Sequence, residues 1–327
     1  MGSSTVPPSA AFLAAFHARA GAAGVLPFDA FMDLALYHPT LGYYRQPRAR
    51  VGYGRGTDFF TASTSGPVFG ELLVAAVVQL LAGRDPGGFT FVEIGAEPGG
   101  GVLHGVTHPF GAVRTVGVGE DLRLSGPCVV FSNELFDAQP CRRFRRREGT
   151  WRELGVAVTP DGLAEVEVDH SAPAFLPVDS PDGYVIDAPL AAAELAGRIA
   201  AEPWTGLFLA LDYGKSWLEL AEVTPAGTAR AYFRHTQGND LLSQPGEQDL
   251  TCHVCWDWLV DRLSQAGFAS PAVESQEAFF IRHANAYLAA VTAAEAGRFS
   301  PKKLSLQQLL HPANLGQKFQ ALHATRF

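Results

Sequence analysis

The sequence is poor in cysteine, with four among 327 residues. Small secreted proteins that depend on disulfide bonds contain far more, so the composition excludes a disulfide scaffold. So few cysteines are compatible with a reducing compartment. The cytoplasm is therefore the location that we expect.

Long apolar runs are also lacking. The longest, "ELLVAAVVQLLAG", is interrupted by Gln79 and is far shorter than the roughly 20 residues of a membrane-spanning helix. The first residues, "MGSSTVPPSA", have neither the basic segment nor the apolar core of a secretory leader. We expect no membrane span, and we interpret the apolar run as a buried helix.

Basic residues are outnumbered, with 25 Lys and Arg against 33 Asp and Glu and a net charge of −8. Because proteins that bind nucleic acids are usually basic, we expect no nucleic-acid partner. The hydrophobic share of 47% is ordinary for a globular protein with a large core.

Apolar strand-like segments alternate with helical ones along the chain. Strands are expected at residues 89–94, up to residue 132 and in "TGLFLALDYG". Helices are expected at residues 10–38, at about 67–81, in "DAPLAAAELAGRIAA" and in "CWDWLVDRLSQAGF". This alternation predicts an α/β fold with a doubly wound, mostly parallel, Rossmann-like sheet. Ligands bind at the carboxyl ends of the strands in such sheets.

Residues 142–168 follow a different pattern, alternating and punctuated by "EGT" and "PDG". The pattern predicts antiparallel hairpins. We therefore divide the chain into an N-terminal helical region with a long loop (1–85), a core (86–140 and 203–327) and an inserted hairpin and helix cap (141–202). The arginine run "RRFRRR" is interpreted either as a surface for an acidic partner or as a solvated edge strand.

A glycine-rich turn, "EIGAEPGGG", follows the strand at residues 89–94. Such a turn lets the backbone approach a nucleotide-like cofactor, although a plain turn has the same composition. The candidate residues for a cofactor are Glu93, Gly95, Gly99 and Gly101.

Three polar side chains crowd the end of the next strand, in "SNELFDAQP". Asn133, Glu134 and Asp137 could recognise an amine or a guanidinium by hydrogen bonding and charge. The alternative is a local cap, in which these side chains bond the backbone of their own turn.

Later segments add further candidates. "LDYG" places Asp212 and Tyr213 at another strand end, and a polar loop supplies His235 and Asp249 as acid and base candidates. A histidine whose bonds are satisfied inside its own loop is the alternative. "CHVC" is half of a zinc site, but the other two cysteines form no matching pair, so we predict no metal.

Several stretches in order resemble one family, the MidA-like class I S-adenosylmethionine-dependent methyltransferases. Mitochondrial members of that family act in assembly of respiratory complex I by methylating an arginine of a subunit. The resemblance covers most of the chain. The stretches that carry it are "FMDLALYHPTLGYY", "GTDFFTASTSGPVFGE", "VEIGAEPGGG", "FSNELFDAQP", "LDYG", "GTARAYFRH" and "PGEQDLTCHV".

The resemblance implies a seven-stranded class I sheet with S-adenosylmethionine as the cofactor. It also implies a protein as substrate or partner, and we include a homodimer among the expected states. The implied cofactor-binding residues are Thr61, Glu93, Gly95, Gly99, Gly101 and Glu120. The implied catalytic residues are Asn133, Glu134 and Asp137, and the implied substrate-binding residues are Asp212, Tyr213, His235 and Asp249.

The chain departs from the family pattern at two places. Glu97 occupies the position of the middle glycine of the cofactor loop, where its carboxylate would repel that of the cofactor unless paired or turned away. In addition, the short interval from Glu93 to Asn133 leaves room for little more than one strand before the fourth. Either Glu120 follows a preserved second strand, or that strand and its helix are missing; we favour the second interpretation.

Two functions remain open from the sequence. The first is methyl transfer to a protein side-chain nitrogen, with arginine as the acceptor that the resemblance implies. The second is a methyltransferase fold that has lost its cofactor and acts as a protein-binding or assembly factor.

Overall fold

The computed structural model describes residues 7–47, 50, 66–97, 100–297 and 300–327. A six-stranded sheet forms the centre of the molecule, in the order β15-β16-β9-β4-β2-β3. The strands β3, β2, β4 and β9 are parallel, and β16 is antiparallel to both of its neighbours. The strands are β2 (Thr90–Ile94), β3 (Ala112–Val116), β4 (Gly126–Asn133), β9 (Trp204–Asp212), β15 (Ala269–Ser275) and β16 (Gln320–Arg326).

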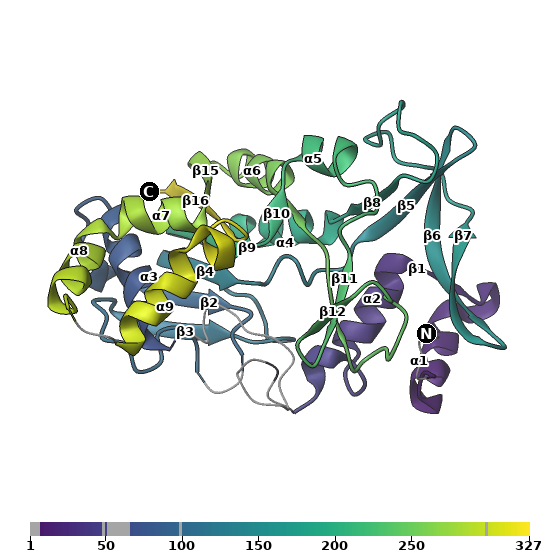
Figure 1. The fold of residues 1–327 in the computed structure, drawn as a ribbon, viewed down its shortest axis with the longest axis horizontal. Coiled ribbons are helices and arrows are strands. Elements are labelled where there is room, and N and C mark those ends of the chain that lie inside the picture. The colour runs from purple at the N-terminus through teal and green to yellow at the C-terminus, as the bar shows by residue number, and fades with distance from the viewer. Residues whose placement is uncertain (1–6, 48–49, 51–65, 98–99, 298–299) are drawn as a thin grey trace.

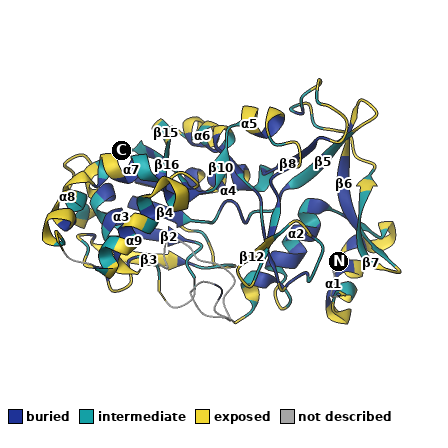
Figure 2. Ribbon diagram, in the orientation of Figure 1, coloured by how far each residue is buried: buried dark blue, intermediate teal, exposed yellow. Residues whose placement is uncertain are grey.

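Helices cover both faces of this sheet, as the sequence predicts for a doubly wound α/β fold (Figure 1). Along β4, Val129 and Phe131 pack on one face, whereas Val130 packs on the other. Because both faces are buried, the central strands are continuous apolar runs (Figure 2). The first face carries α3 (Pro67–Leu80), α7 (Gln276–His283), α8 (Asn285–Ala294) and α9 (Pro301–Leu310), and the second carries α4 (Leu190–Ala201) and α6 (Trp256–Gln265).

A second strand is preserved at the edge of the sheet. β3 pairs in parallel with β2, and Val116 lies opposite Ile94. Our favoured interpretation, that this strand is missing, is therefore wrong. The stretch at 117–125, all of it described, holds neither strand nor helix before β4 begins. Among the residues that the structure describes, the sheet consequently has six strands rather than the seven that the family resemblance implies.

The N-terminal region is helical, as predicted, and contains two helices, α1 (Ala10–Ala20) and α2 (Phe28–Tyr37). They are separated by the short strand β1 (Val25–Pro27), which pairs with β6 of the inserted region. A separate apolar core, rich in aromatic side chains, joins the two helices to this region. The N-terminal helices and the insert thus form one continuous packing unit.

The inserted region is antiparallel, as predicted. Its strands run in the order β1-β6-β5-β8, with β7 paired to β6. β5, the arginine run, lies between two neighbours, so the interpretation as an edge strand is wrong. Four of its arginines form ion pairs with carboxylates of the insert, so these side chains stabilise the inserted sheet. The bounds are β5 (Arg142–Arg147), β6 (Thr150–Thr159), β7 (Gly162–Val168) and β8 (Val185–Ala188), and the pairs are Arg142–Glu153, Arg143–Glu165, Arg143–Asp187, Arg145–Glu165 and Arg147–Glu167.

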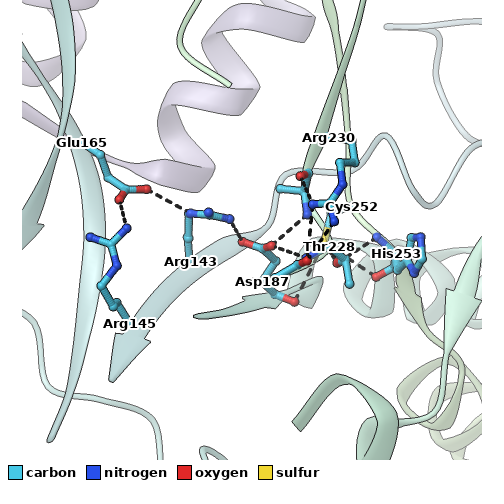
Figure 3. Close-up of polar contacts among 10 residues, drawn as sticks. Arg143, Arg145, Glu165, Asp187, Thr228, Arg230, Cys252 and His253 are labelled. Carbon is cyan, nitrogen blue, oxygen red and sulfur yellow. Dashed lines mark hydrogen bonds and ion pairs between the residues drawn. The ribbon is translucent and has the colours of Figure 1, made fainter. Parts of the chain in front are cut away.

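Asp187 connects the insert to a small three-stranded sheet (Figure 3). Its carboxylate pairs with Arg143 and accepts hydrogen bonds from the backbone N–H groups of Thr228 (2.7 Å) and Ala229 (2.8 Å). These bonds fix the segment that leads into the small sheet. Its strands are β11 (Arg230–Phe233), β12 (Thr236–Gly238) and β13 (Asp249–Thr251).

The helix α4 lies at the end of the predicted insert (141–202), but its buried side chains pack in the core of the six-stranded sheet. No helix in the described part of the chain is both long and apolar enough to cross a membrane. The remaining strand pair is β10 (Gly214–Lys215) with β14 (Val254–Cys255), next to the helix α5 (Trp217–Glu222).

Candidate active site

A cavity of about 1260 Å³ opens at the carboxyl ends of β2, β3 and β4. The N-terminal region and the small sheet supply its other walls. Most of the predicted site residues meet there. Those that line it are Glu93, Gly95, Gly101, Glu120, Asn133, Glu134, Asp137, Tyr213 and Asp249. Two further predicted residues, Thr61 and Gly99, lie outside the described residues.

The glycine-rich turn is shaped around a buried carboxylate. Glu93 accepts a hydrogen bond from the backbone N–H of Val102 (2.6 Å). Any side chain at Gly101 would collide with that carboxylate, and Gly95 has φ of 81°, which favours glycine. Burial raises the pKa of Glu93 to about 7. The turn therefore presents backbone and one partly protonated carboxyl group to the cavity.

Glu120 lies just beyond the end of β3, in the position that the preserved second strand gives it. Its carboxylate accepts a hydrogen bond from the backbone N–H of Gly117 (2.9 Å). Arg45 of the N-terminal region reaches the same turn and donates to the carbonyl of Val118 (2.9 Å). Glu120 therefore lies after the strand that neighbours β2, which is where a class I fold places the acidic residue that binds the ribose.

Glu97 is paired. Arg50, which is only 3% exposed, approaches the carboxylate of Glu97 through Nη2 (2.9 Å) and Nε (3.4 Å). The same guanidinium donates to the carbonyls of Tyr43 and Gln46. The charge that would repel a cofactor carboxylate is therefore compensated by a cation lining the same cavity.

The turn after β4 carries the three predicted catalytic side chains. Glu134 takes a positive φ of 51°, which is uncommon outside glycine and points to a constrained turn. Asn133 donates from Nδ2 to the Glu134 carboxylate (2.9 Å), and its Oδ1 is buried with no hydrogen-bond partner among the described residues. Neither Glu134 nor Asp137 takes part in an ion pair within the described part of the chain.

Asp212 lies beneath this turn and does not reach the cavity wall. It is fully buried, and its carboxylate accepts from the backbone N–H groups of Phe136 (2.8 Å), Asp137 (3.3 Å) and Tyr213 (2.8 Å). The prediction of a substrate-binding role does not match this position. Asp212 instead fixes the backbone that presents Glu134 and Asp137.

Mutual repulsion and burial raise the pKa values of the acids in this turn. Burial is the largest cause for Glu134, followed by the charge of Asp212. Burial and the charges of Asp212, Glu134 and Asp249 raise the pKa of Asp137 well above its ordinary value. The same burial raises the pKa of Asp212 to about 7. Such a group of acids favours a cationic ligand or takes up protons.

An aromatic wall faces these acids. Tyr37 and Tyr44 stack with ring centroids 5.5 Å apart, and Tyr44 donates a hydrogen bond to Asp249 (2.9 Å). Tyr232 of β11 lines the cavity as well. None of these tyrosines was predicted as a site residue, although all three fall in stretches that carry the family resemblance. Arg50 was also missed, because no local pattern distinguishes it.

His235 and the cysteines do not contribute to the cavity. His235 lies in the exposed turn between β11 and β12, outside the cavity wall formed by the described residues. A role in binding substrate inside the cavity does not match this position. All four cysteines are buried and free, and the "CHVC" stretch belongs to no cluster of potential metal ligands among the described residues.

The residues present fit S-adenosylmethionine. Gly95 and Gly101 line the cavity with backbone alone, and the carboxylate of Glu93 lies between the turn and Gly101, where a Cβ would collide with it. Glu120 offers a second carboxylate, of the kind that holds ribose hydroxyls in nucleotide-binding folds. The apolar side chains of Ile94 and Leu122 line the same part of the cavity and suit an adenine ring. The fold and this cavity define a class I S-adenosylmethionine-dependent methyltransferase.

Comparisons with known proteins agree. Residues 118–273 match a family described as "Putative S-adenosyl-L-methionine-dependent methyltransferase". A crystal structure from Burkholderia thailandensis, bound to S-adenosylhomocysteine, superposes with a TM-score of 0.85 at 25% identity over 97% of this chain and 92% of that one. The family match and the structural neighbour support a MidA-like methyltransferase with S-adenosylmethionine as its cofactor.

Two relatives carry a more specific name, "Protein arginine methyltransferase NDUFAF7, mitochondrial". The protein of Danio rerio is 26% identical, over 73% of this chain and 68% of its own length. The protein of Mus musculus is 30% identical, over 59% of this chain and 45% of its own length. The matched region therefore covers less than half of the mouse protein.

Proposed function

We propose that this methyltransferase modifies an arginine side chain of a protein partner. The observation that carries the proposal is the set of hydrogen-bond acceptors at the turn after β4. Asn133 Oδ1 is buried without a donor, and the carboxylates of Glu134 and Asp137 have no cation in the described part of the chain. A guanidinium has five N–H donors and no acceptor, so its chemistry complements this set.

The aromatic wall supports the same acceptor. A planar guanidinium stacks on aromatic faces and is less strongly hydrated than an ammonium group. Tyr37 and Tyr44 line the cavity together with the acids. An arginine is also the acceptor named for the NDUFAF7 relatives.

The residues of this turn have two tasks in the reaction. The cofactor supplies an electrophilic methyl group, so the protein must orient the acceptor nitrogen and remove its proton. Asn133 and Glu134 orient the guanidinium through hydrogen bonds. Burial and neighbouring charges raise the pKa of Asp137, which makes it a stronger base than an ordinary carboxylate, and we assign it the proton that leaves the nitrogen.

The test is methyl transfer from labelled S-adenosylmethionine to an arginine-containing peptide, with the matching lysine peptide as comparison. We expect transfer to arginine only. Asp137→Asn should lower the rate by about 10² to 10⁴-fold, while the affinity for S-adenosylhomocysteine, measured by calorimetry, should stay nearly unchanged. Asp261→Asn, on the exposed side of α6, is the matched control.

The outcomes separate the two functions left open by the sequence. Binding of S-adenosylhomocysteine without transfer to arginine would contradict the proposed acceptor. No heat and no thermal shift with either cofactor form would contradict the enzyme and support the assembly factor. The cytoplasmic location and the homodimer stay predictions; fractionation and sedimentation would test them.

A further inference from the structure

A cluster of potential metal ligands lies away from the cavity, at the far edge of the sheet. It consists of Glu274 on β15, His283 at the end of α7 and His323 on β16. The ligand atoms of these three residues all lie within 4.8 Å of one another. None of the three lines the cavity described above.

The fold brings the three side chains together from separate elements. β15 and β16 are antiparallel, with Glu274 opposite Ala321 and His323 opposite Ala272. Glu274 and His323 are therefore diagonal neighbours on the same face of the sheet. The chain turns into α7 directly after β15, and His283, the last residue of α7, lies with its ring centroid 5.2 Å from that of His323.

The distances suit a tetrahedral metal site. Nε2 of His283 lies 3.2 Å from Oε1 of Glu274, and Nε2 of His323 lies 3.1 Å from the same oxygen. Metal–ligand bonds of about 2.0–2.2 Å at tetrahedral angles place neighbouring ligand atoms about 3.4 Å apart. A metal ion would thus need only small movements of the side chains.

The surroundings orient the ligands. Arg282 pairs with the other oxygen of the Glu274 carboxylate (2.6 Å), which directs Oε1 toward the two histidines. The ring of Phe279 packs against His283 and His323, with centroid distances of 5.1 and 5.6 Å.

We propose that Glu274, His283 and His323 bind one zinc ion, or a divalent transition metal of the same preference, with water as the fourth ligand. Two histidines and one glutamate with an open position are an established ligand set for zinc. The ion would connect α7 with β15 and β16, at the edge of the sheet that β15 forms. The proposal does not depend on the proposed methyl transfer.

The experiment is a metal titration of the full chain after removal of metals with a chelator. Equilibrium dialysis against Zn²⁺ followed by elemental analysis should give one zinc per wild-type chain. His323→Gln should lose the zinc, and His17→Gln, which changes an exposed histidine of α1, should keep it. Zinc should also raise the unfolding temperature of the wild type but not of His323→Gln.

The absorption spectrum of bound Co²⁺ distinguishes binding at this site from binding by the cysteines. Co²⁺ bound by two histidines and a carboxylate should give visible d–d bands without the near-ultraviolet charge-transfer band of a thiolate. A wild type that retains no zinc, or a thiolate band, would overturn the proposal. Equal zinc retention by His323→Gln would do the same. Should His323→Gln fail to fold, Glu274→Gln and the wild-type cobalt spectrum still decide the question.

Discussion

Replacing Glu93 by glutamine should stabilise the folded protein at alkaline pH and weaken its hold on the cofactor. Glu93 is 9% exposed, and its described hydrogen bond comes from Val102 N–H. A glutamine oxygen can accept the same bond, so the substitution removes a buried charge and retains the contact. The change in unfolding free energy caused by Glu93→Gln therefore measures how much this cofactor-binding carboxylate destabilises the fold.

The magnitude follows from the pKa. Burial raises the pKa of Glu93 from its ordinary 4.5 to about 7. Between these values the folded protein holds a proton that the unfolded chain releases, so the free energy of unfolding falls as the pH rises through this window. At 1.36 kcal/mol per pH unit the loss is about 3 kcal/mol, and it is complete above about pH 7.

The assay is urea unfolding of the wild type and Glu93→Gln at about pH 4, 6 and 8. The difference in unfolding free energy should be small at the lowest pH and approach about 3 kcal/mol in favour of the variant at the highest. Glu222→Gln, on the exposed end of α5, is the control and should follow the wild type. A difference that does not change with pH would refute the reasoning, since an ionising Glu93 is its only source.

Three further predictions concern the pairs that shape the cavity. Arg50→Met should weaken binding of S-adenosylhomocysteine about 5- to 30-fold, because the unpaired carboxylate of Glu97 would repel the carboxylate of the ligand by about 1–2 kcal/mol. Adding Glu97→Gln to the same chain should restore the affinity. Calorimetry measures both affinities. Asp212→Asn should lower the unfolding free energy by about 1–3 kcal/mol in urea, because an amide cannot accept from both sides. Tyr44→Phe should remove the bond to Asp249 and reduce transfer to the arginine peptide, with cofactor binding unchanged in the same calorimetric assay.

The central strands could be predicted from the sequence because they are buried on both faces. β4 and β9 are continuous apolar runs, and the turns after them carry the polar residues that mark the carboxyl edge. The hairpins of the insert were equally visible, because alternation and turn residues are local signals. Asn133, Glu134 and Asp137 could be placed at the site for the same reason.

β3 could not be predicted because it is an edge strand whose side chains are mostly exposed. Its sequence, "AVRTV", lacks the apolar run of its neighbours, so the interval before β4 suggested a deletion. The pairing of Arg50 with Glu97 depends on two loops that meet only in the folded chain. The position of Asp212 beneath its turn likewise follows from hydrogen bonds to a segment far away in the sequence.

The charges of the cavity bear on the choice between an enzyme and a binding factor. Glu134 and Asp137 are held close to Asp212, and their raised pKa values show that this arrangement destabilises the charged forms. A protein under no demand for a cationic acceptor would gain stability by losing one of these acids. Where the cofactor would bind, a buried arginine compensates Glu97, which was one of the two reasons to doubt the cofactor. Both halves of the cavity therefore retain features that cost stability and that methyl transfer to a guanidinium would use.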